Sequence, residues 1–119
     1  MTVSAFEVVH IPGSFGYRIQ TNDRTIVISG DTIPVDAVVT ACNGCDLLFH
    51  EVYGLTGDPN NPTASYHTNA TALGELARRA RPKHLAVYHD VRVPREAGLT
   101  AIAKAFSGKV TFANDLDVF

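Results

Sequence analysis

Short apolar runs separated by polar turns fill the first quarter of the chain. Residues 5–10 (AFEVVH) and 16–21 (GYRIQT) are rich in β-branched and aromatic residues, a composition that predicts strands. The polar sequence TNDR at 21–24 predicts a turn into a third strand, 25–29. The chain therefore begins with three predicted strands.

The rest of the chain alternates between helical and extended patterns. Apolar residues recur at helical spacing in three segments, and continuous apolar runs of strand length follow each of them. This order predicts an α/β fold with about three helices and a mixed β-sheet that is at least partly parallel. The predicted helices are 34–43, 69–80 and 95–106, the predicted strands are 46–51, 84–89 and 109–115, and a turn-rich loop fills 53–66.

Composition narrows the class of protein. The 119 residues suit a single domain, 1–119, and 45% are apolar, enough for a packed core. A net charge of −2 gives no electrostatic case for nucleic acid or for an anionic membrane. The start of the chain lacks the basic and apolar blocks of a signal peptide, and the two cysteines do not make a secreted disulfide framework. These features predict a cytoplasmic protein without a membrane partner.

Histidine, aspartate and glutamate gather where predicted strands end. His10, Asp31 and His89 each follow a strand, and His50-Glu51 closes another. Ligands bind at the carboxyl ends of strands in α/β sheets, and a carboxylate can bridge two cations roughly 3.5–4 Å apart while imidazoles complete their coordination. The pattern indicates a metal site, although a turn aspartate and structural histidines would look the same.

Two other chemistries are open at this stage. His67, in the loop sequence ASYHTNA, could donate or accept a proton above such a site. Cys42 and Cys45 form a C-x-x-C pair that could carry thiol redox chemistry, but they stand at the end of a predicted helix, where the helix dipole does not favour a thiolate.

Five segments, taken together, resemble a known family. They are VVHIPGSFGYRIQ, TIVISGDTIP, CDLLFHEVYG, YHTNATALGELARRARPKHLAVYHD and VTFANDLDVF, and they cover nearly the whole chain. In this order they resemble the C-terminal half of a metallo-β-lactamase-fold hydrolase. The nearest branch is that of ribonuclease Z, the tRNA 3′-processing endonuclease, with its phosphodiesterase and arylsulfatase-like relatives. The resemblance implies half of an αββα sandwich.

The resemblance also implies roles for individual residues. His10 would be a metal ligand, Asp31 would bridge two metal ions, and His89 would bind the second ion. The metal would be zinc or manganese. His67 matches the loop histidine that assists catalysis, and Glu51 matches the acid of a "HEAT"-like element that orients it.

One departure from the family limits the expected activity. The family's His-x-His-x-Asp-His signature does not occur in these 119 residues, so the chain offers at most two ligands for each metal ion, whereas a catalytic zinc usually takes three. We therefore expect no hydrolysis by the chain alone, with the metal either lost or shared with a second chain. The segment between Gly16 and Asp31 is too short for a tRNA-gripping arm, so nucleic acid is a partner only by resemblance.

Half of a sandwich would leave one sheet face uncovered. The apolar strands 26–28, 46–49 and 85–88 are too hydrophobic to face water, which predicts a homodimer or a partner chain on that face. Three functions remain open. They are metal-dependent hydrolysis of phosphodiester or other ester bonds completed by a second chain, a non-catalytic dimeric half-domain or gene remnant, and thiol redox chemistry at Cys42 and Cys45.

Overall fold

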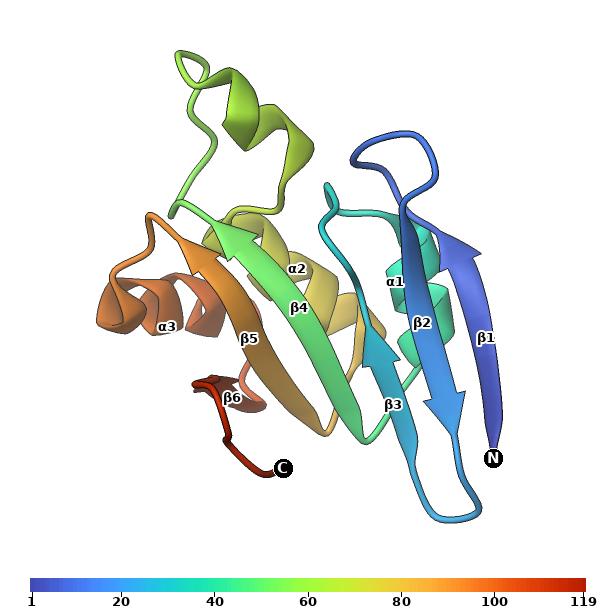
Figure 1. Ribbon diagram of the computed structural model, residues 1–119. Helices are drawn as coiled ribbons and strands as arrows, with labels where there is room; N and C mark the ends of the chain where they lie inside the picture. The colour runs from blue at the N-terminus through green and yellow to red at the C-terminus, as the bar shows by residue number, and fades with distance from the viewer.

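A computed structural model describes residues 1–119, which form one six-stranded sheet with three helices along one of its faces (Figure 1). The elements in chain order are β1 (Thr2–Glu7), β2 (Phe15–Gln20), β3 (Thr25–Ile28), α1 (Asp36–Cys42), β4 (Leu47–Tyr53), the short 3₁₀ helix η1 (Pro62–Tyr66), α2 (Ala70–Ala80), β5 (His84–Val91), α3 (Arg95–Ala103) and β6 (Lys109–Phe112).

The sheet combines an antiparallel and a parallel part. Its spatial order, β1-β2-β3-β4-β5-β6, is the order of the chain. The first three strands form an antiparallel meander, and β3 to β6 are parallel. Successive parallel strands are connected by α1, α2 and α3, and crossovers of one hand place their helices on one face. The carboxyl ends of β3, β4 and β5 consequently meet at one edge.

The helix-covered face carries the core. Val27, Leu48 and Leu85 are register neighbours on β3, β4 and β5, and all three are fully buried. Helix α2 approaches α3 so closely that a Cβ at Gly74 would lie 2.7 Å from the carbonyl oxygen of Ile102. Glycine at this position therefore sets the spacing of the two helices.

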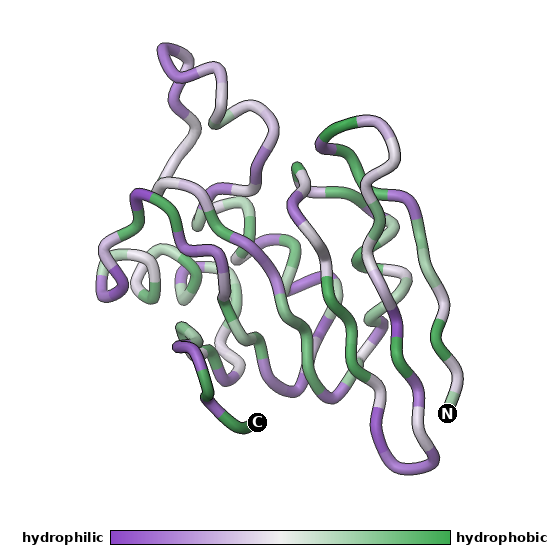
Figure 2. Tube along the Cα trace, viewed as in Figure 1, coloured by the Kyte–Doolittle hydropathy of each residue, from purple (hydrophilic) through white to green (hydrophobic).

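The other face of the sheet has no helical cover. Tyr17, Ile28, Phe49 and Ala86 are register neighbours across four strands, and their parity is opposite to that of the core residues. Tyr17 is 45% exposed, and the ring of Phe119 packs edge-on against Phe49 at a centroid distance of 5.3 Å. Apolar residues continue along β3, β4 and β5 (Figure 2). The predicted half-sandwich is confirmed.

Two strand boundaries differ from the sequence prediction. The first strand ends at Glu7, so His10 lies in the β1–β2 loop and not at a strand end. One more cross-strand bond follows, from the amide of Val8 to the carbonyl of Ser14, and pairing then stops because the chain turns through Pro12 and Gly13. Strand β5 runs on to Val91, past the predicted end.

Three further elements deviate by a few residues. Helix α3 and strand β6 are shorter than predicted, and the predicted loop 53–66 contains the 3₁₀ helix η1. Pro62 stands at the start of η1, where its missing N–H costs nothing, and Asn61 caps the amide of Thr63. The longest helix, α2, has 11 residues, and none of the helices could cross a membrane.

Candidate metal centre

Asp31 reaches the sheet edge through a tight connection after β3. Gly30, which precedes it, has a φ of +66°, and a Cβ there would lie 2.8 Å from the carbonyl oxygen of Phe15. A side chain at position 30 would therefore clash with the neighbouring strand, which explains the Ser-Gly-Asp sequence. The connection leaves the Asp31 carboxylate half-buried at the carboxyl edge.

His89 reaches the same edge through a β-bulge. Glu51 on β4 pairs with Tyr88, but Val52 pairs with Asp90, so His89 has no partner in the ladder. Its φ of +48° is uncommon for a residue other than glycine. The bulge brings His89 Nε2 to 3.5 Å from Asp31 Oδ2, and bulges beside functional sites commonly redirect a side chain in this way.

His67 completes a group of three. One ligand atom from each of Asp31, His67 and His89 lies within 4.8 Å of the other two. A carboxylate with two imidazoles is a donor set suited to zinc or manganese. Asp31 is half-buried and His89 exposed, so an ion could enter from solvent.

Glu51 is a buried residue that contacts the group through His67. Its Oε1 accepts hydrogen bonds from His67 Nδ1 at 2.8 Å, from the Thr32 amide at 3.0 Å and from the Thr68 amide at 3.3 Å. Its Oε2 is buried without a partner. Burial raises the pKa of Glu51 to about 7, and the bonds from the two threonine amides oppose the rise. A carboxylate behind a histidine that faces a metal is the usual supporting arrangement.

The contacts of His67 determine which nitrogen it presents to the group. Burial, followed by the neighbouring His10, lowers the pKa of His67, while Asp31 opposes the change. Neutral His67 donates its Nδ1 proton to Glu51, so Nε2 retains a lone pair for a cation or a proton. The ring of Tyr53 stacks on the imidazole at 5.1 Å with an interplanar angle of 15°. Two side chains of β4 therefore hold this ring in place.

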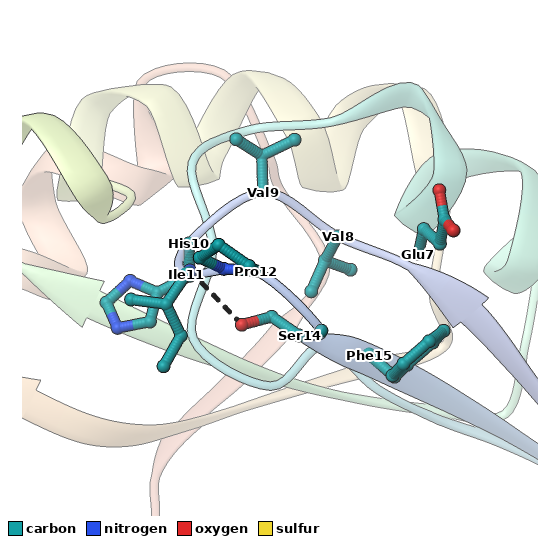
Figure 3. Close-up of a pocket in the computed structure, with 9 residues that line it drawn as sticks. Glu7, Val8, Val9, His10, Ile11, Pro12, Ser14 and Phe15 are labelled. Atoms are coloured by element: carbon teal, nitrogen blue, oxygen red, sulfur yellow. Dashed lines mark hydrogen bonds between the residues drawn. The ribbon is translucent and has the colours of Figure 1, made fainter.

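His10 lies beside the group but is not one of the three. Its ring centroid is 4.7 Å from that of His67, and its Nδ1 donates to the carbonyl oxygen of Tyr66 at 3.0 Å. Figure 3 shows the imidazole at the end of the β1–β2 loop, which encloses a hollow of about 360 Å³ lined by residues 7–15. Ligation by His10 stays a prediction.

His50 is not part of the ligand group but lies in the core. His50 pairs in register with Val87 and shares the core-facing parity of Leu48, so it is fully buried among apolar residues. Its Nδ1 donates to the carbonyl oxygen of Glu51 at 2.8 Å, and its Nε2 has no partner. Burial lowers the pKa of His50 to about 4. It is a neutral core residue near pH 7.

Cys42 and Cys45 form a disulfide and are nearly fully buried. The bond joins the last residue of α1 to the turn that leads into β4. Because disulfides are rare in a reducing cytosol, the cytoplasmic location stays a prediction.

Sequence patterns alone missed several residues that shape the site. They are Thr32 and Thr68, whose amides bind Glu51, and Tyr53 and Tyr66, which contact the two loop histidines. The threonines directly follow Asp31 and His67, so the pairs Asp-Thr and His-Thr were the available signal.

No family model matches the chain. Ribonuclease Z of Mycobacterium tuberculosis (strain H37Rv) is 28% identical over 113 residues, a match that covers 87% of this chain and 41% of that protein. Ribonuclease Z of Brevibacillus brevis is 39% identical over 66 residues, covering 56% of this chain and 21% of the relative. The chain thus spans half or less of the length of these curated relatives.

Solved structures show the same relation. The metallo-β-lactamase fold protein YhfI from Bacillus subtilis superposes with a TM-score of 0.81 at 21% identity, over 94% of this chain and 46% of that one. The short form of human tRNase Z gives a TM-score of 0.69 at 28% identity, over 97% of this chain and 40% of that one. These matches confirm the resemblance that the sequence indicated.

Proposed function

We propose that this chain, which has one half of the metallo-β-lactamase fold, is the metal-binding half of a ribonuclease Z-like hydrolase of phosphodiester or other ester bonds. The observation that carries the proposal is the group formed by Asp31, His67 and His89 at the carboxyl edge of parallel strands, with Glu51 buried behind it. Similarity to ribonuclease Z proteins supports the reaction class.

The bound ion in this proposal is zinc or manganese. A divalent cation would polarise a phosphoryl or carbonyl oxygen and lower the pKa of a bound water. Asp31 and His89 are proposed ligands. Their side chains are 3.5 Å from each other and make no shorter hydrogen bond, so both are free to bind an ion. His10 is the further proposed ligand, in line with the family resemblance.

His67 and Glu51 carry the proposed proton chemistry. Glu51 fixes the imidazole through Nδ1 at 2.8 Å, so Nε2 is the nitrogen that can hold a proton for an ester oxygen. Glu51 is a positioning residue because it acts on the reaction only through His67. Burial lowers the pKa of His67 and so favours the neutral imidazole, whose Nε2 must take up a proton before it can pass one to an ester oxygen.

The proposed activity requires a second chain. Asp31, His89 and His10 would give each of two metal ions at most two protein ligands, whereas a catalytic zinc usually takes three. The sheet face beside the group exposes Phe15 and Tyr17 at 43% and 45%. We propose that a second copy covers this face in a cytoplasmic homodimer, and that the chain alone does not hydrolyse esters.

Native mass spectrometry with added zinc or manganese tests the proposal. We expect a dimer that binds metal stoichiometrically, and loss of binding in Asp31→Ala. Asp115→Ala, which removes an exposed aspartate from the C-terminal segment, is the matched control and should bind metal as the parent does. A chain that ignores both metals would contradict the proposal and favour the non-catalytic half-domain.

A further inference from the structure

An exposed tyrosine stands at the mouth of the candidate metal centre. Tyr66 is the last residue of η1 and directly precedes His67, and it is 52% exposed. Its position is fixed through the backbone, because the Tyr66 carbonyl accepts the 3.0 Å hydrogen bond from His10 Nδ1. The backbone at Tyr66 is therefore held next to His10, while the ring remains half exposed to solvent.

Four rings form a row that joins Tyr66 to the ligand group. Tyr66 meets His10 edge-on at a centroid distance of 6.4 Å and an angle of 89°, and His10 lies 4.7 Å from His67. His67 in turn lies 5.9 Å from His89. Tyr66 is one end of this row, and His89, a proposed metal ligand, is the other.

The β1–β2 loop adds apolar surface next to His10. Val9 and Ile11, the two neighbours of His10 in the chain, are 53% and 64% exposed, and Figure 3 shows both on the loop that carries the imidazole. Water solvates such surface poorly. The approach to the ligand group is consequently apolar and aromatic on this side.

We infer that Tyr66 is a stacking platform for a planar ring in the substrate, next to the ester bond that the metal centre would hold. This inference rests on the proposed function. An exposed aromatic ring beside a metal centre that would bind a charged ester can stack on a flat ring, and such stacking raises affinity roughly tenfold or more per ring. The ring could be a nucleobase or the aryl group of a simpler ester, and both present the same planar face.

Matched ligand pairs test the platform. We would titrate the zinc-loaded chain, followed by NMR, with phenylphosphonate against methylphosphonate, and with uridine 5′-monophosphate against ribose 5-phosphate. In the parent, at least one ring-bearing ligand should bind about tenfold more tightly than its ringless partner. A gain with uridine alone identifies a nucleobase, and a gain with phenyl alone identifies an aryl group.

Substitutions assign the gain to one side chain. Tyr66→Phe should keep the advantage, whereas Tyr66→Ala should remove it and leave the ringless ligand unchanged, because the anchoring contact uses the backbone carbonyl. Leu116→Ala removes an exposed apolar side chain from the C-terminal segment, away from the proposed dimer face, and is the control.

The outcomes separate this inference from the proposed function. An advantage that survives in Tyr66→Ala, or no advantage in the parent, would overturn the platform. If the ringless phosphonate binds as tightly without zinc as with it, the metal proposal fails while the platform is still judged by the ring-bearing pair. If no ligand binds at all, both are contradicted.

Discussion

Replacing His50 by leucine should make the protein more resistant to acid. His50 is fully buried, its Nε2 has no partner, and burial lowers its pKa from 6.5 to about 4. Protonation is thus disfavoured in the folded state, whereas the unfolded chain binds the proton with its ordinary pKa. The contribution to stability is present above pH 6.5 and is lost as the pH falls toward 4.

The size of the effect follows from the shift in pKa. One unit corresponds to about 1.4 kcal/mol, so moving from pH 7.5 to pH 4.5 should cost the parent roughly 2–3 kcal/mol through this residue. Leucine has a similar volume and cannot be protonated. At pH 7.5 the variant should be about as stable as the parent, because it loses one hydrogen bond but also removes the unpaired nitrogen.

Urea unfolding of parent and His50→Leu at both pH values measures this effect. The pKa of Glu51 is shifted in the opposite sense, to about 7, so its contribution is lost as the pH rises from about 4.5 toward 7 and partly masks His50 in the parent. Both chains contain Glu51, and the difference between them cancels that contribution. An equal difference in unfolding free energy at pH 4.5 and pH 7.5 would refute the reasoning.

Three further predictions follow from contacts in the core and the site. Glu51→Ala should lower the unfolding free energy by about 3–6 kcal/mol, because three buried N–H donors lose their acceptor. Glu51→Gln should lower it much less, because the amide retains an oxygen that can accept; thermal melts of both variants measure the difference. Gly74→Ala should cost about 1–3 kcal/mol through its clash with Ile102, while Gly57→Ala, which meets nothing within 4 Å, should be nearly neutral in the same melts. If His67 carries protons and is not a ligand, His67→Ala should keep at least one bound zinc per chain in native mass spectrometry. Loss of all zinc in that variant would instead show that His67 is a ligand.

The sequence predicted which residues are ligand candidates, but not how their side chains are placed. Strand patterns located Asp31 and His89 at one sheet edge because alternating helices and strands imply parallel neighbours. The same patterns could not reveal that His89 is a bulged residue inside β5, because a bulge depends on the register with β4 and not on local composition.

Local sequence patterns also could not predict the contacts between residues in different loops. The resemblance predicted that Glu51 orients His67, and the 2.8 Å contact agrees with it, but nothing local joins residues sixteen positions apart. His10 was expected at a strand end and instead anchors the loop around Tyr66. Long-range contacts of this kind depend on the closed fold, so they could be inferred only through relatives.

The order of the strands has a consequence for how the chain folds. Each strand pairs with the strand that comes next in the sequence, so no strand has to insert between two that are already paired. Within the meander β1–β3 the paired residues are close in sequence, so these contacts form with a smaller loss of loop entropy than the parallel pairs do. The meander β1–β3 can form first, and each later helix–strand unit then adds to its growing edge, in the order in which a ribosome releases them.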